Sequence, residues 1–276
     1  MIRRILLPLD NSKYTQTGLK YAKRIAKRTD GEISGMVILD LKGIDDAVGP
    51  YVPGGTSLVE MLEKKEEKEA QEHIDTLLDM FRTSCSEDNV KHREFEYQGS
   101  PSNNIIKESF FYDMLIIGMR TFFHFETSNL PGDSLDKILD HTVTPIFAVP
   151  DNYKKIEKVL VVGDKNNASF RALQRFSHIA ENSGYEISLL MKSDDKKEAD
   201  FYLTRSEEYL RAYGMDKIEK EWTNHSLREI IENKYLDKVD MIVIGSHQHK
   251  SLKEFVLGTL EDYLIKANVK PVFIVQ

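Results

Sequence analysis

The chain of 276 residues contains an internal repeat, and this repeat restricts the possible folds more than any other feature. Three pairs of segments carry it: DMLIIGMR (113–120) with DMIVIGSH (240–247), TPIFAVP (144–150) with KPVFIVQ (270–276), and RRILLPLDNS (3–12) with EKVLVVGDKN (157–166). Self-similarity of this kind predicts copies of one structural unit. We place the two domains at 1–150 and 156–276, with a polar connector after Pro150.

Each copy alternates short apolar runs with longer amphipathic segments. The apolar runs predict strands, namely ILLPL, ISGMVIL, REFEY, MLIIG and PIFAV in the first copy and VLVVG, EISLLM, KIEKEW, MIVIG and PVFIV in the second. Between the runs, apolar residues recur at helical spacing, as at Leu19, Ala22 and Ala26. This alternation favours an α/β fold with two tandem Rossmann-like domains, each a five-stranded parallel sheet with helices on both faces.

The first copy is longer because of an insertion at 42–84. Its first part, 42–57, is rich in glycine and proline and is expected to form a loop. A long helix containing EKKEEKE at 63–69 follows, and we expect it to project into solvent. The loop is either a lid over a site or a tolerated insertion.

Composition excludes several classes of function. The formal net charge is −7, whereas sequence-independent binding to nucleic acid needs clustered Lys and Arg. The one cysteine, Cys85, cannot form an internal disulfide, which fits a reducing compartment. No apolar run approaches the roughly 20 residues that span a bilayer. We therefore expect a cytoplasmic protein that binds neither nucleic acid nor membrane.

Ligands of open parallel sheets bind beyond the carboxyl ends of the strands. In this chain those ends carry Pro8, Asp10, Gly163, Asp164, Gly118 and Gly245, and the last helices begin near Gly132 and Gly258. Glycine leaves room for a phosphate against the main chain, and a helix amino terminus offers free N–H groups. Thr259 adds a hydroxyl donor, and Asp10 or Asp164 can accept from an adenine amino group or a ribose hydroxyl. An aspartate after a strand is also a common turn former or helix cap, so both interpretations remain open.

The spacing Gly245-x2-Gln248-x9-Gly258-Thr259 resembles that of the universal stress protein family, whose nucleotide-binding members carry Gly-x2-Gly-x9-Gly-Ser/Thr. The likeness covers nearly the whole chain as two tandem domains. It includes ILLPLDNSKYTQTGLKYAKRIA at 5–26 and the closing strands PIFAVP and PVFIVQ. The resemblance implies a fold like that of the adenine nucleotide alpha hydrolases and an adenine nucleotide, ATP, ADP or AMP, as ligand.

The resemblance also implies which residues would hold the nucleotide. The adenosine end would lie at Pro8, Asp10 and Ile38 or at Gly163, Asp164 and Met191, and the phosphates at Gly245, Gln248, Gly258, Thr259 and Leu260 or at Gly118, Gly132 and Ser134. The second copy keeps the better phosphate cradle, since Thr121 and Asp133 alter the first. Glu261 lies where the family often has a second hydroxyl, and a carboxylate there repels phosphate but caps a helix well.

Single-domain members of the family dimerise by pairing their last strands. The resemblance therefore implies an internal pseudo-dimer in which 145–149 lies beside 271–275. Such pairing covers two strand edges that otherwise invite aggregation. A protein partner and a further homodimer remain open.

Three classes of function compete. The first is a nucleotide-binding stress-response or signalling protein, and the second is a ligand-free tandem scaffold that acts through protein–protein interaction. The third is a serine esterase, because PGDSL at 131–135 places Ser134 in an esterase-like motif, although no Asp-x-x-His follows near the carboxyl end. We expect no enzymatic activity beyond slow hydrolysis of ATP. We also expect no metal site, since His247 and His249 lack a third ligand.

Overall fold

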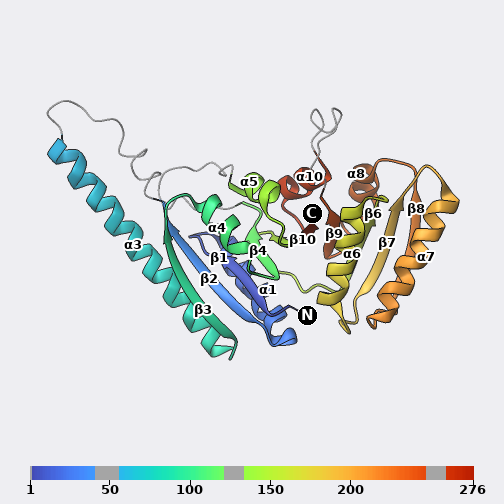
Figure 1. Cartoon of the computed structure of the whole chain (residues 1–276), viewed down its shortest axis with the longest axis horizontal. Helices are drawn as coiled ribbons and strands as arrows, with labels where there is room; N and C mark the ends of the chain where they lie inside the picture. The colour runs from blue at the N-terminus through green and yellow to red at the C-terminus, as the bar shows by residue number, and fades with distance from the viewer. Residues whose placement is uncertain (1, 41–55, 121–133, 247–258) are drawn as a thin grey trace. The chain divides into compact units, whose positions relative to one another are not determined.

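The computed structural model describes residues 2–40, 56–120, 134–246 and 259–276 (Figure 1). Its contacts divide the chain into two compact units. One unit is Arg3–Thr142, and the other is Val143–Gln276 together with the first two residues. Among the described residues, no helix has both the length and the apolar character that a membrane crossing requires.

The unit Arg3–Thr142 contains a parallel sheet. Its strands are β1 (Arg4–Pro8), β2 (Glu32–Leu39), β3 (Lys91–Gln98) and β4 (Met114–Gly118), in the spatial order β3-β2-β1-β4. The helices are α1 (Lys13–Thr29), α3 (Thr56–Glu87), α4 (Pro101–Ser109) and α5 (Ser134–His141). The later turns of α3 bury Ile74 and Phe81 against the sheet, whereas the start of the helix extends away from the sheet (Figure 1). The predicted loop lies outside the described residues, apart from its last two positions, which begin α3.

The unit Val143–Gln276 repeats this four-stranded arrangement and adds two strands. Its strands are β5 (Ile146–Val149), β6 (Lys158–Gly163), β7 (Glu186–Lys192), β8 (Ile218–Thr223), β9 (Met241–Gly245) and β10 (Val272–Val275), in the order β5-β10-β9-β6-β7-β8. The helices are α6 (Asn167–Ala180), α7 (Lys196–Ala212), α8 (Leu227–Ile230), the π-helical turn η1 (Ile231–Tyr235) and α10 (Leu260–Ala267). Strands β6 to β10 pair in parallel. All ten predicted strands and the α/β class are confirmed.

Strand β5 lies beside β10 in the second unit, although it belongs to the first repeat. It pairs antiparallel with β10, so that Phe147 lies opposite Phe273 and Ala148 lies opposite Val272. These side chains are buried. The predicted pairing of 145–149 with 271–275 is confirmed, and it covers edges that would otherwise expose unpaired backbone groups.

The glycines that end β4 and β9 allow a helix to approach the sheet closely. A Cβ atom at Gly245 would lie 2.3 Å from the carbonyl carbon of Ala168 and from the backbone nitrogen of Ser169, both in the first turn of α6. The repeat-equivalent Gly118 is similar, since a Cβ there would lie 2.4 Å from Cβ of Tyr14 in α1. Neither glycine has a positive φ. The packing of the helix, rather than the geometry of a turn, therefore requires glycine at both positions.

Substitution of two strand-end glycines tests this packing. We expect Gly245→Ala to lower the free energy of unfolding by about 1–3 kcal/mol, because the new methyl group meets backbone atoms that cannot rotate away. Gly163→Ala at the end of β6 is the matched control, since its Cβ meets the flexible Met191 Cε at 2.6 Å. Urea denaturation followed by circular dichroism measures both. Equal losses for the two variants would contradict the proposed packing.

The thiol of Cys85 provides a second test of the fold. Cys85 lies on α3, is fully buried, and its burial raises the pKa of the thiol to about 11. Only about one thiol in a thousand is then ionised at pH 8, so we expect thiol reagents to label the native protein slowly and the urea-unfolded protein rapidly. Because the chain has one cysteine, the labelling rate reports this position alone. Rapid labelling of the native protein at pH 8 would disprove this packing.

Candidate functional site

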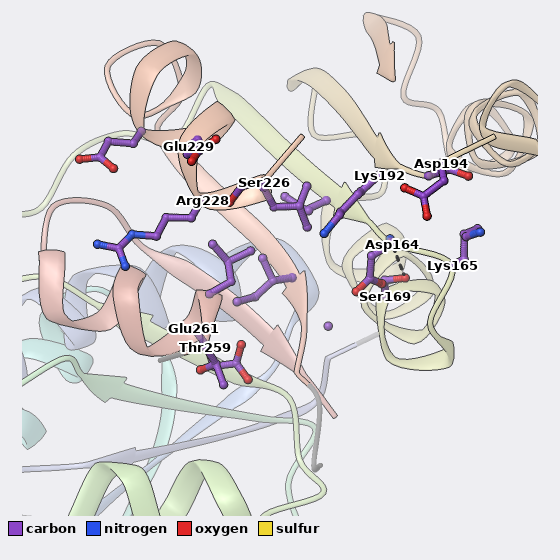
Figure 2. A pocket seen from close by; sticks show the side chains of 17 residues that line it. Asp164, Lys165, Ser169, Lys192, Asp194, Ser226, Arg228, Glu229, Thr259 and Glu261 are labelled. Carbon is purple, nitrogen blue, oxygen red and sulfur yellow. Dashed lines mark hydrogen bonds between the residues drawn. The ribbon is translucent and has the colours of Figure 1, made fainter. Parts of the chain in front are cut away.

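A cavity of about 720 Å³ lies in the second unit, at the carboxyl ends of β6, β7 and β9 (Figure 2). This volume is within the usual range for small-molecule sites, and the place is the one where open parallel sheets bind ligands. The charged side chains among the described lining residues are Lys165, Lys192, Arg228, Asp164, Asp194, Glu229, Glu232 and Glu261. The apolar lining residues are Val162, Leu227, Ile244 and Leu260.

The aspartate after the first strand of each repeat organises the following turn. The Asp164 carboxylate accepts from the backbone N–H of Asn166 at 3.2 Å, and Asn166 caps α6. The equivalent Asp10 accepts from the Thr15 hydroxyl at 2.7 Å and also from the Ser12 hydroxyl. Asp10 is only 2% exposed. Both aspartates therefore act as turn formers, and Asp164 in addition lines the cavity.

Lys165 follows Asp164 and is fixed at the rim of the cavity. Its ammonium lies 2.7 Å from the Glu198 carboxylate on α7. The hydrogen bond from Lys165 to Glu198, with their Coulomb attraction, raises the pKa of Lys165. Glu198 also accepts from the Ser193 hydroxyl at 3.2 Å. This cation is thus already paired within the protein.

Lys192 is different, because its ammonium has no ion-pair partner in the part of the chain that the structure describes. The side chain leaves the end of β7 and extends toward the space between Ser226 and Asp164 (Figure 2). The third cation of the cavity, Arg228, stacks on the Tyr263 ring with its guanidinium carbon 4.4 Å from the ring centre. Lys192 is therefore the lining cation best placed to meet an anionic ligand.

The amino terminus of α10 already carries acidic groups of its own. Thr259 caps the helix, since its hydroxyl accepts from the Asp262 N–H at 3.2 Å and the Asp262 carboxylate accepts from the Thr259 N–H at 3.1 Å. Glu261 is 8% exposed and accepts from the Ser246 hydroxyl at 2.8 Å. These carboxylates lie where the helix dipole would otherwise favour a bound anion.

The structure brings some of the sequence-predicted residues of the second repeat together and separates others. Asp164, Gly245, Thr259 and Leu260 line the cavity. Gly163 and Met191 instead border a separate void of about 20 Å³, which is too small for a nucleotide. Met191 is buried with its thioether against Gly163. Gln248 and Gly258 lie outside the described residues.

The predicted residues of the first repeat are mostly buried at strand ends. Pro8, Ile38 and Gly118 are buried, and Ile38 is only 1% exposed. Ser134 begins α5, but its side chain is not described, and Gly132 lies outside the described residues. The positions of Thr121, Asp133, His247 and His249 also lie outside them. In the described part of the chain, no group of three His, Cys, Asp or Glu residues could hold a metal ion.

The sequence pattern did not identify the part of the cavity that comes from the end of β7 and the segment after it, and from α8 and η1. These residues are Lys192, Ser193, Asp194, Ser226, Leu227, Arg228, Glu229 and Glu232. Polar segments directly after the predicted strands EISLLM and KIEKEW carried the signal. Because all carboxyl ends of a parallel sheet meet at one edge, these segments lie at the same edge as Asp164 and Gly245.

A model of the universal stress protein family matches residues 1–150 and 155–276. A universal stress protein of Synechocystis sp. is 21% identical over 289 residues, which cover 98% of this chain and 99% of that protein. The crystal structure of a universal stress protein from Archaeoglobus fulgidus superposes with a TM-score of 0.73 at 19% identity, covering 99% and 96% of the two chains. The cytoplasmic domain of a prokaryotic cation chloride cotransporter also superposes, with a TM-score of 0.60 at 8% identity over 99% and 95%. The fold alone therefore does not determine the function.

The Thr259 cap is expected to stabilise α10 and with it the folded protein. We expect Thr259→Ala to lower the free energy of unfolding by about 1 kcal/mol, because the N–H of Asp262 loses its acceptor. Ser226→Ala is the matched control, since Ser226 precedes α8 without a side-chain cap hydrogen bond. Thermal denaturation compares the two variants. If Ser226→Ala lowered the free energy of unfolding equally, the effect of Thr259→Ala could not be attributed to the lost cap.

Proposed function

Since this chain belongs to the universal stress protein family, we propose that it acts in the stress response by binding an adenine nucleotide in the cavity of its second unit. The observation that carries the proposal is the Lys192 ammonium, which extends into the cavity without an ion-pair partner among the described residues. A charged group that lacks a protein partner at a ligand-sized cavity favours a ligand of opposite charge. A nucleotide phosphate has that charge.

The remaining lining suits the other parts of a nucleotide. The apolar side chains of Val162, Leu227 and Ile244 offer a surface for a flat base. Ser226 and Asp194 offer hydrogen-bonding groups for ribose hydroxyls. The described wall thus combines apolar side chains with hydrogen-bonding and charged groups, as a ligand made of a base, a ribose and a phosphate requires.

A specific observation favours a second function, that of a ligand-free tandem scaffold. Glu261 and Asp262 already occupy the positions at the start of α10 where a phosphate would gain most from the helix dipole. In the scaffold the cavity would stay empty of nucleotide, and the protein would act through its surface. Binding of a nucleotide to the purified protein distinguishes the two functions.

The nucleotide proposal predicts a thermal shift that depends on Lys192. ATP, ADP or AMP at a hundred times its Kd stabilises the folded state by about 2.7 kcal/mol and raises the Tm. We expect Lys192→Gln to weaken binding about tenfold, because one charge-assisted contact to phosphate is lost. Calorimetric titration of the three nucleotides, with mass spectrometry of any co-purified ligand, measures the effect.

Lys196→Gln is the matched control for this experiment. Lys196 lies on α7, pairs with Asp200 at 2.8 Å and does not line the cavity. The Lys196→Gln variant removes the same charge from the same region of the chain. We therefore expect this variant to bind nucleotide with the affinity of the unaltered protein. Absence of any shift at millimolar nucleotide would reject the proposal in favour of the scaffold.

A further inference from the structure

We infer that Glu261 makes the cavity selective for the number of phosphates, so that in metal-free solution AMP binds more tightly than ADP, and ADP more tightly than ATP. This inference rests on the proposed function, because it concerns the same cavity. The preferred ligand would be the nucleoside monophosphate, and Glu261 would set this preference.

Glu261 lies in the wall of the cavity. Its side chain lines the cavity although the residue is only 8% exposed, and the Ser246 hydroxyl holds one carboxylate oxygen at 2.8 Å. The side chain comes from the first turn of α10, directly after the cap residue Thr259 and Leu260. Glu261 is therefore a fixed negative charge in the wall, at the place where a phosphate would otherwise meet free N–H groups.

The described part of the cavity wall carries a net negative charge. Among the described lining residues, carboxylates outnumber cations: Asp164, Asp194, Glu229, Glu232 and Glu261 against Lys165, Lys192 and Arg228. Two of the cations are engaged, because Lys165 pairs with Glu198 and Arg228 stacks on Tyr263. Among these described lining residues, Lys192 is thus the cation left to meet a phosphate, and further phosphates would approach the carboxylates.

AMP, ADP and ATP differ in negative charge. Each further phosphate adds about one negative charge, and inside a partly enclosed cavity like charges repel more strongly than in water. The buried carboxylate of Glu261 cannot move away easily, because Ser246 holds it. We therefore expect AMP to bind about tenfold more tightly than ATP, since repulsion of this size is common between close charges of like sign.

The test measures the affinities of AMP, ADP and ATP by calorimetric titration of the full chain in the presence of a metal chelator. The informative variant is Glu261→Gln, which removes the charge and keeps an amide oxygen to accept from Ser246. We expect this variant to strengthen ATP binding about fivefold and to change AMP binding less than about twofold. The ratio of the ATP and AMP dissociation constants then becomes smaller. The control is Glu208→Gln on α7, which removes the same charge from a residue that pairs with Arg205 outside the cavity.

A measurement on the unaltered protein makes the test independent of the folding of the variant. Salt screens repulsion between charges, so the ratio of the ATP and AMP dissociation constants is expected to fall as sodium chloride rises. A preference for AMP that narrows in salt and in Glu261→Gln, but not in Glu208→Gln, supports the inference. Nucleotide binding without a preference for AMP, or with a preference that Glu261→Gln leaves unchanged, overturns the inference and leaves the proposed function standing. Absence of all nucleotide binding overturns both.

Discussion

The contact between the first turn of α6 and the end of β9 determines the geometry of the second unit. Because residue 245 has no side chain, the backbone at Ala168 and Ser169 can lie directly against the strand. The turn that contains Asp164 is held by the same helix start and so reaches the mouth of the cavity. Gly118 and Tyr14 make the corresponding contact in the first unit. The strand-end glycine therefore has a structural role in both repeats, whether or not a ligand binds.

At the opposite wall of the cavity, acidic groups of the protein itself lie where an anion would otherwise be favoured. A helix amino terminus attracts anions, and α10 meets this tendency with Asp262 in its capping box and with Glu261 held by Ser246. Such acidic groups stabilise the helix and at the same time reduce what a phosphate can gain there. Under the proposed function, Lys192 on β7 is the described lining cation that would attract a phosphate, and it lies at a strand end rather than at the helix.

The fold could be predicted well from the sequence, whereas the site could be predicted only in part. Buried parallel strands leave continuous apolar runs, as at β4 and β9. The edge strands β3 and β8 are half exposed and mix charged with apolar residues, but they too were predicted as strands. The site depends on finer geometry. Successive residues of a strand face opposite sides of the sheet, so Met191 turns onto Gly163 while Lys192 reaches the cavity. The spacing of the motif pointed to the end of β7, but to Met191 and not to its neighbour Lys192. The contribution of α8 depends on how a short helix is oriented, which no local pattern encodes.

The pairing of β5 with β10 has a consequence for how the protein is made. During synthesis β5 leaves the ribosome early, but its partner follows about 120 positions later, which at 5–20 residues per second is a delay of roughly ten seconds. Until then the nascent chain carries a short, strongly apolar segment, IFAV, with an unpaired edge. Completion of the second sheet therefore also ends the period in which this segment is exposed to wrong partners and is available to chaperones.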